Sequence, residues 1–279
     1  LDGGVYEVNA DMSNDLATCR YGRHASNLGG LIAAAIAGRS GIKAYIADPV
    51  IVDEMEPLAR LSGWPAIERK SIFHALNQKA VARRYAGEIG RTYGEVNLVV
   101  AHMGGGISVG AHRGGRVIDV NNALDGDGPY SAERSGGLPL FSVMERCYAG
   151  THTLEELQKS FVGRGGLAAY LGTSDAVAIG HRIAGGDDYA RLILEGMAYQ
   201  VAKEIGAAAA VLEGEVDAVI LTGGLANDTR VTESVTRRVS FIAPVIVYPG
   251  EDELAALAET TARALAGLIP IKTYRKEQA

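Results

Sequence analysis

A glycine-rich stretch, AHMGGGISVGAHRGG at residues 101–115, contains the residue types and spacing that most resemble a reactive site. Residues 106–110 match the Gly-x-Ser-x-Gly pattern of serine hydrolases, with Ser108 in the place of the nucleophile. That motif needs a strand, a sharp turn at the serine and then a helix, because the turn exposes the hydroxyl. Ser108 instead stands within a predicted strand that leads into another turn. The context therefore argues against a hydrolase and leaves the glycines to be explained.

Glycine-rich loops recur at three places along the chain. The first loop consists of Gly104, Gly105 and Gly106. Glycine can adopt positive φ, which lets successive N–H groups converge on an anion, although an isolated run of three glycines also suits an ordinary tight turn. Two further glycine loops favour a binding role over an ordinary turn. They are LTGGLAND, with Gly223 and Gly224, and ERSGGLP, with Arg134. Glycine loops at the ends of separate strands suit a nucleotide that lies across a cleft.

The elements that would position these loops form an α/β pattern. The stretch at 97–124 predicts a meander of three strands joined by glycine turns. Strands predicted at 216–224 and 241–250 are each flanked by helices, at 188–213 and 251–267. The alternation predicts that the C-terminal half is an α/β domain.

Near the N-terminus, residues 27–41 predict a helix of small residues, and the short apolar segment after it predicts a strand. Pro49 ends that strand and leaves Asp48 at its carboxyl end, where α/β sheets commonly present functional side chains. A further helix is predicted at 77–90, where apolar residues recur at helical spacing. His112, His152 and His181 show no spacing typical of metal ligands and are assigned structural roles.

Composition and charge exclude several classes of protein. The 279 residues suffice for one large domain or two ordinary ones. With 27 basic and 33 acidic side chains, the net charge of -6 argues against a nucleic-acid surface. Cys19 and Cys147 lie too far apart in sequence to suggest a disulfide framework or a thiolate metal site, and no apolar run is long enough to cross a membrane. We therefore expect a soluble cytoplasmic protein.

Several segments spread over the whole chain carry a more specific signal. They are VVAHMGGGISVGAHRGGRVIDVNNALDGDGPYSAERSGGLP at 99–139, YGRHASNLGG at 21–30, IADPVIVDEMEPLARLSGWP at 46–65, SIFHALNQKA at 71–80 and ILTGGLAND at 220–228. Together these segments resemble the acetate-kinase-like acyl kinases, in particular their butyrate kinase group, within the actin, sugar kinase and Hsp70 superfamily. The resemblance implies reversible transfer of the ATP γ-phosphoryl group to a short-chain carboxylate, which yields an acyl phosphate and ADP.

The resemblance also implies an α/β fold with two ribonuclease H-like domains around a cleft. The first domain would comprise residues 1–48 and 253–279, and the second, with the nucleotide site, residues 49–252. Family members of this type are expected to be homo-oligomers of at least two copies. The cofactors implied are ATP or ADP and Mg²⁺, and the substrate is a short-chain carboxylate or its acyl phosphate.

Catalytic roles follow from the resemblance, motif by motif. His74 would contact the transferring phosphoryl group, and Phe73 beside it would line the acyl pocket. Asp48 would be associated with Mg²⁺, and His102 would precede the phosphate-binding turn. Arg134 would stabilise the transition state.

Other positions take binding roles by the same resemblance. The nucleotide-binding glycines are Gly104, Gly105, Gly106, Gly223 and Gly224. Asp252 or Glu253, where the last strand meets the last helix, would help to place Mg²⁺. His24 and Asn27 would lie near the wall of the substrate pocket.

The chemistry agrees with these residue types. Phosphoryl transfer depends on positioning and charge neutralisation more than on covalent chemistry. A carboxylate is already anionic at neutral pH and needs no general base, so the difficulty is to bring two anions together. Mg²⁺ held through Asp48, the guanidinium of Arg134 and donors from His74 and His102 would meet that need.

The beginning of the chain departs from the family pattern. Residues 1–4 align past a strand, a hairpin with an Asn-Pro-Gly-Ser-Thr-Ser segment that embraces the γ-phosphate, and an Arg that holds the substrate carboxylate. We therefore expect a fragment of a longer protein whose first domain is missing its N-terminal strands. The alternative is a truncated product that folds poorly, because its sheet exposes an edge, and is inactive.

Two further questions stay open at this point. A non-catalytic nucleotide-binding protein of the actin or Hsp70 kind would keep the nucleotide glycines but would not need Phe73 and His74 at an acyl pocket. The loop motifs favour butyrate or a branched short-chain acid over acetate. Acids that differ by one methylene group differ by only about 1–3 kcal/mol in a hydrophobic pocket, which sequence alone does not resolve.

Overall fold

The computed structural model describes residues 1–20 and 26–275. Its larger sheet has five strands in the order β7-β6-β5-β8-β9. Their bounds are β5 Leu98–Met103, β6 Ile107–Arg113, β7 Arg116–Val120, β8 Ala218–Gly223 and β9 Val245–Pro249. Strands β5, β6 and β7 form the antiparallel meander expected from the sequence, and β8 and β9 extend the sheet in parallel with β5. The expected α/β character of the C-terminal half is confirmed.

Helices cover both faces of this sheet because side chains along its central strands alternate between the two faces. Val99 and Ala101 of β5 pack with α8 (Asp188–Val211) and α9 (Thr229–Val239) in one apolar cluster. Leu98 and Val100, which alternate with them along the strand, pack on the other face against Val81 and neighbouring residues of α3 (Ala75–Glu88). The central strands are therefore buried on both sides.

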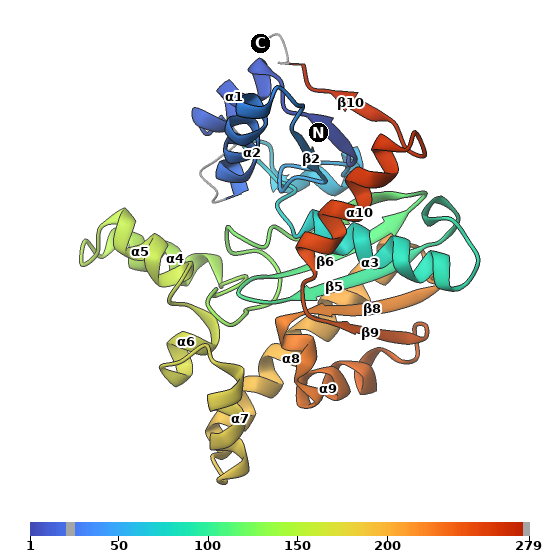
Figure 1. The fold of residues 1–279 in the computed structure, drawn as a ribbon. Helices are drawn as coiled ribbons and strands as arrows, with labels where there is room; N and C mark the ends of the chain where they lie inside the picture. The colour runs from blue at the N-terminus through green and yellow to red at the C-terminus, as the bar shows by residue number, and fades with distance from the viewer. Residues whose placement is uncertain (21–25, 276–279) are drawn as a thin grey trace.

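A smaller three-stranded sheet joins the two ends of the chain (Figure 1). Its order is β10-β1-β2, with β1 at Val5–Glu7, β2 at Tyr45–Ala47 and β10 at Ile271–Thr273. Helices α1 (Ala10–Ala17), α2 (Ser26–Ser40) and α10 (Glu253–Leu265) accompany it. Helices α3 and α10 contact each other between the two sheets. The domain boundaries predicted from the sequence stay a prediction.

The remaining elements lie at the periphery. They are the hairpin β3 (Leu61–Trp64) and β4 (Ile67–Glu68), the short 3₁₀ turns Pro57–Arg60, Tyr93–Glu95 and Gly224–Asn227, and the helices α4 (Leu140–Tyr148), α5 (Leu154–Phe161), α6 (Gly166–Leu171) and α7 (Ala176–Ala184). Helices α4 to α7 form arms that project from the larger sheet (Figure 1). Thr153 and Glu156 form a reciprocal capping box at the start of α5.

In the described part of the chain, no helix is both long and apolar enough to span a bilayer.

A buried ion pair connects α3 to the N-terminal segment and to β7. Lys79 Nζ lies 2.7 Å from Glu54 Oε2, and each side chain is only 4% exposed. Glu54 also accepts hydrogen bonds from the backbone N–H groups of Gly3 and Val117. Burial alone would raise the pKa of Glu54, but Lys79 and these donors outweigh it and leave the pKa below its ordinary value. Glu54 is therefore held as a carboxylate.

The substitution Lys79→Met should destabilise the protein by about 3–5 kcal/mol, because it leaves a buried carboxylate without its partner. Urea unfolding measures the loss. Without Lys79, burial raises the pKa of Glu54 in the variant, whereas the native pKa lies below the ordinary value of 4.5. The deficit relative to the native protein should therefore begin to shrink above pH 4.5 and continue to shrink below it, as Glu54 takes up a proton first in the variant and then in the native protein.

The matched control is Lys159→Met, which breaks the exposed pair between Lys159 and Glu155 on α5. Exposed pairs of this kind contribute about 0.3–0.5 kcal/mol. Equal losses for the two substitutions would contradict the role assigned to the buried pair.

Candidate active site

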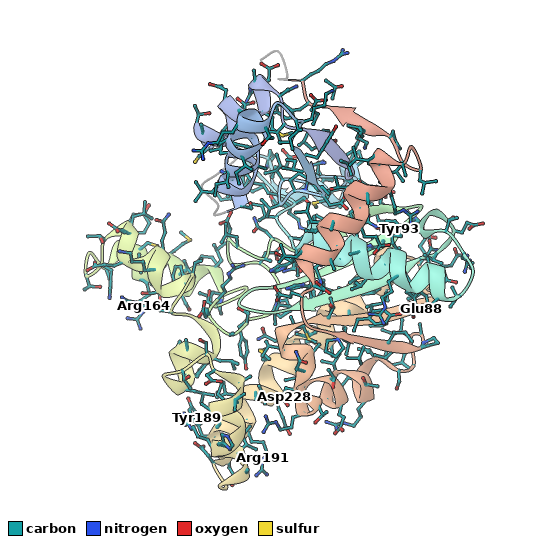
Figure 2. The ribbon with its side chains drawn as sticks, in the orientation of Figure 1. Glu88, Tyr93, Arg164, Tyr189, Arg191 and Asp228 are labelled. Carbon is teal, nitrogen blue, oxygen red and sulfur yellow. The ribbon has the colours of Figure 1, made fainter. Side chains whose placement is uncertain are left out.

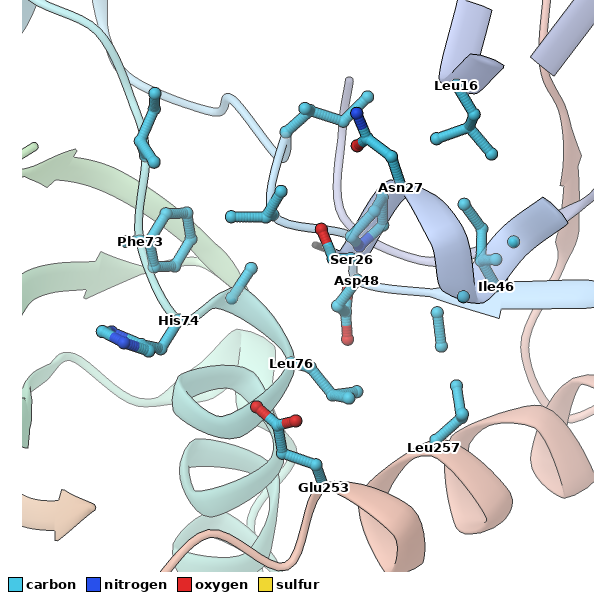
Figure 3. A pocket seen from close by; sticks show the side chains of 18 of the residues that line it. Leu16, Ser26, Asn27, Ile46, Asp48, Phe73, His74, Leu76, Glu253 and Leu257 are labelled. Carbon is cyan, nitrogen blue, oxygen red and sulfur yellow. The ribbon is translucent and has the colours of Figure 1, made fainter. Parts of the chain in front are cut away.

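A pocket of about 520 Å³ lies between the smaller sheet, the start of α3 and the start of α10 (Figure 3). The structure describes all but one of the residues predicted for the catalytic, substrate and metal roles, and His24 lies outside the described residues. Six of the others line the pocket: Asn27, Asp48, Phe73, His74, Arg134 and Glu253. Residues from distant parts of the chain thus meet at one cavity.

His74 and His102 are in direct contact. His74 immediately precedes α3, and its ring stacks on that of His102 with 3.7 Å between the ring centres and 8° between the planes. His74 Nδ1 lies 2.8 Å from the hydroxyl oxygen of Ser108 on β6. His102, fully buried on β5, places its own Nδ1 2.8 Å from Asn77 Oδ1. Each imidazole is therefore fixed by stacking and by a hydrogen bond.

Glu251 contacts the pair of stacked histidines and is a site residue that sequence reasoning missed. Its Oε1 lies 3.1 Å from His102 Nε2, a buried nitrogen that makes no well-formed hydrogen bond to any described residue. The contact with His102 lowers the pKa of Glu251, although partial burial opposes that effect. The sequence offered the acidic run at 251–253 after Gly250, but nothing in it distinguished the residue that reaches His102.

The glycines at 104–106 matter for space and not for backbone conformation. None of the three adopts the positive φ that glycine permits. A Cβ on Gly104 would lie 2.9 Å from Glu251 Oε1, and one on Gly106 would lie 2.1 Å from Arg134 Nη1. A Cβ on Gly105 would meet its nearest neighbour only at 3.8 Å. The outer two glycines therefore make room for charged side chains that lie against the backbone.

Arg134 extends over this loop into the pocket. Its guanidinium donates a short hydrogen bond to the carbonyl of Ala123, and burial lowers its pKa although Glu133 and Asp125 oppose that shift. The simpler alternative, a surface ion pair with the adjacent Glu133, is not observed, and no other described carboxylate forms an ion pair with Arg134. Its positive charge thus stays available to an anion in the pocket.

The second pair of glycines lies beside the first loop, at the carboxyl ends of the parallel strands β5 and β8. Gly223 has φ +90°, and a Cβ there would lie 2.5 Å from the carbonyl oxygen of Met103. Only glycine permits this close approach. Gly224 begins the turn Gly224–Asn227 and has open space around its Cα. The two glycine loops therefore lie together at the carboxyl ends of the parallel strands, where α/β sheets commonly bind ligands.

Asp48 is already engaged within the protein. One carboxylate oxygen accepts a 2.7 Å hydrogen bond from the Gly4 N–H, and the other accepts two 3.0 Å bonds from Arg83. Arg83 is a partner that sequence reasoning did not find. Asp48 still faces the pocket, so a role beside a metal stays a prediction, but its charge is largely neutralised by Arg83.

The two acidic candidates at the start of α10 differ clearly in placement. Asp252 caps the helix and accepts a hydrogen bond from the Ala255 N–H, whereas Glu253 points into the pocket towards Asp48 (Figure 3). Among the described residues, the Glu253 carboxylate makes no hydrogen bond or ion pair, and no cluster of three His, Cys, Asp or Glu side chains could hold a metal. One carboxylate with phosphate oxygens and waters suits Mg²⁺, so Glu253 fits such a site.

Known proteins match most of this chain. Residues 66–249 match the family model described as the acetokinase family. The chain is 55% identical over 273 residues to Butyrate kinase 2 of Clostridium acetobutylicum, which covers 98% of this chain and 77% of that protein. The chain belongs to the acetokinase family. The resemblance identified from the motifs is therefore confirmed.

Solved structures of acetokinase-family enzymes confirm the fold. Porphyromonas gingivalis acetate kinase superposes with a TM-score of 0.83 at 22% identity, covering 95% of this chain and 75% of that one. A propionate kinase from Francisella tularensis gives a TM-score of 0.77 at 20% identity, with 94% and 77% covered. The expected α/β kinase fold is thus confirmed.

The contrast between the two acidic residues can be tested by stability. The substitution Asp252→Ala removes the cap of α10 and should cost about 1 kcal/mol in the free energy of unfolding. Glu253→Gln should change it by less than about 0.5 kcal/mol, as is usual for surface substitutions that remove no structural contact. Urea unfolding of the two variants measures this difference. A larger loss for Glu253→Gln than for Asp252→Ala would contradict the assignment.

Proposed function

We propose that the protein is a butyrate kinase, which reversibly transfers the γ-phosphoryl group of ATP to butyrate or a branched short-chain acid. The observation that carries the proposal is the pocket that His74 and Arg134 line together, with the Arg134 guanidinium lying against Gly106 of the first glycine loop. The 55% identity to a protein named Butyrate kinase 2 supports the same activity. ATP would bind along the glycine loops, and the acid would bind in the pocket beside Phe73.

The pocket groups match the demands of this transfer. The acid attacks as a carboxylate, so the site needs no general base and instead must draw two anions together. Arg134 supplies a positive charge that forms no ion pair with a described carboxylate, and His74 supplies a hydrogen-bond donor at the same wall. An arginine in such a position contributes on the order of 10³-fold or more in rate.

The apolar part of the pocket favours an acid with an alkyl chain longer than that of acetate. Ile72, Phe73 and Leu76 at the start of α3, together with Leu124, line the cavity. Each methylene that these walls bury contributes roughly 0.8 kcal/mol, so a four-carbon acid gains over a two-carbon acid. We expect butyrate or a branched acid to be preferred and acetate to be the poorer substrate.

The proposal includes Mg²⁺ as a cofactor, with Glu253 as the residue that helps to hold it and Asp48 at the same side of the pocket. When bound, the ion would neutralise negative charge on the nucleotide phosphates. Glu253→Gln should therefore raise the Mg²⁺ concentration needed for half-maximal activity, whereas Asp252→Ala should not. Asp252→Ala should thus affect mainly stability, and Glu253→Gln mainly the Mg²⁺ requirement.

The proposal also places the enzyme in the cytoplasm as a homo-oligomer, with no nucleic-acid or membrane partner. The two cysteines are free thiols, which agrees with a reducing compartment. The net charge of -6 agrees with the absence of a nucleic-acid surface.

The test is ATP-dependent formation of acyl hydroxamate in the presence of Mg²⁺ and hydroxylamine, with acetate, propionate, butyrate, isobutyrate and isovalerate. It is performed on the full-length protein, with its natural termini. We expect acid-dependent turnover that is greatest with the four- and five-carbon acids. A well-folded full-length protein that binds ATP but yields no hydroxamate with any acid would instead support the non-catalytic nucleotide-binding alternative.

Two substitutions in the glycine loop provide a sharper test of the site. Gly106→Ala should lower kcat by about 10²-fold or more, because its Cβ would displace the guanidinium of Arg134. Gly105→Ala places the same methyl group one residue away, where a Cβ has ordinary space, and should keep kcat within about threefold. Similar activity for both variants would show that Arg134 does not act from this position.

A further inference from the structure

A line of polar side chains runs through the interior from Tyr93 to the ring of His74. The Tyr93 hydroxyl lies 2.8 Å from His112 Nδ1, and His112 Nε2 lies 2.9 Å from Gln78 Oε1. Gln78 Nε2 lies 3.0 Å from the carbonyl oxygen and 2.8 Å from the hydroxyl oxygen of Ser108. Ser108 Oγ in turn lies 2.8 Å from His74 Nδ1. His112, Gln78 and Ser108 have no exposed surface.

The direction of each hydrogen bond is fixed from one end by a backbone carbonyl. The carbonyl oxygen of Ser108 can only accept, so Gln78 must turn its NH₂ group towards Ser108 and its oxygen towards His112. His112 Nε2 must then carry the proton that Gln78 accepts. Burial lowers the pKa of His112 well below its ordinary value, so the ring is neutral and its bare Nδ1 accepts from the Tyr93 hydroxyl. Tyr93, labelled in Figure 2, is half-buried with its hydroxyl at the inner end.

The same reasoning gives the direction of the hydrogen bond between Ser108 and His74. Gln78 donates both to the carbonyl and to the hydroxyl oxygen of this serine, so the hydroxyl proton points to the remaining neighbour, His74 Nδ1. We propose that Ser108, oriented by Gln78, holds His74 as the neutral tautomer with its proton on Nε2. A proton on Nδ1 instead would leave the buried hydroxyl proton of Ser108 without this acceptor, which costs about 1–3 kcal/mol.

This arrangement explains why a serine and a histidine in hydrogen-bond contact do not form a hydrolytic pair. Ser108 is fully buried in the middle of β6, and its hydroxyl lies between Gln78 and His74. No carbonyl substrate can reach it there. Ser108 is a positioning residue: it acts through His74, whose Nε2–H donates a hydrogen bond to the phosphoryl group in the pocket. The inference rests on the proposed kinase function for that last step alone.

Stacking on His102 completes the constraint on His74. The two rings are parallel within 8°, which fixes the plane in which Nδ1 and Nε2 lie. His102 is itself fixed by Asn77, the residue before Gln78. Consecutive side chains of α3 thus orient both imidazoles, one directly and one through Ser108.

The experiment compares Ser108→Ala, Ser108→Thr and the native full-length protein. For Ser108→Ala we expect kcat to fall by about 10- to 100-fold, the usual cost of losing a group that orients a functional residue, with KM values for ATP and acid within about threefold. Ser108→Thr keeps the hydroxyl and should restore much of the loss. Ser234→Ala removes a buried serine hydroxyl on α9, remote from the site, and should leave kcat unchanged.

The tautomer is read directly from the ¹⁵N shifts of His74 in protein labelled with ¹⁵N-histidine, with His74→Gln used to assign the signal. The native protein should show a neutral ring protonated on Nε2, and Ser108→Ala should show a mixture of tautomers. A native ring protonated on Nδ1, or a Ser108→Ala variant with native kcat, would overturn the proposal. This measurement requires no turnover, so a protein inactive with every acid would refute the kinase function while the tautomer could still be determined.

Discussion

The attachment of helix α3 to both sheets is the constraint on which the site depends. Its first two turns place Asn77 and Gln78 against β5 and β6, and the next residue, Lys79, forms the buried pair with Glu54. One turn further, Arg83 holds Asp48 at the end of β2. A shift of the helix would leave several buried polar groups unpaired at once, and each such group costs about 1–3 kcal/mol. The ring of His74 is rigid because the helix that carries it is fixed at so many points.

The charges around the pocket are divided between structure and function. Arg83 is neutralised by Asp48, and His102 contacts Glu251, so these groups hold the walls together. Arg134 is the cation of the pocket that forms no ion pair with a described carboxylate. Fixed donors in a partly desolvated site stabilise developing charge without reorganising, which is what a reaction between two anions requires. Arg134 is therefore the residue to which we assign stabilisation of the charge that develops during phosphoryl transfer.

Local patterns allowed much of the fold, and the motifs many of the site positions, to be predicted from sequence. The meander, the strand at Ala218–Gly223 and the long helix at Asp188–Val211 each show their own periodicity or glycine boundary. Glu251, Arg83 and Gln78 could not be predicted in this way, because each meets its partner across 30 to 149 residues of sequence and lies in a segment whose pattern shows only a helix or a turn. The glycine turn between β5 and β6 could be predicted, but its need for space could not, because the side chains that lie against it, Glu251 and Arg134, come from distant segments.

A crystal structure of the full-length protein with ADP, Mg²⁺, aluminium fluoride and butyrate would test the central claim most directly. The account predicts aluminium fluoride between the nucleotide and the acid, within hydrogen-bond distance of His74 Nε2 and the Arg134 guanidinium. The alkyl chain of butyrate should lie against Phe73. A nucleotide bound away from the glycine loops, or an acid that does not enter this pocket, would contradict it.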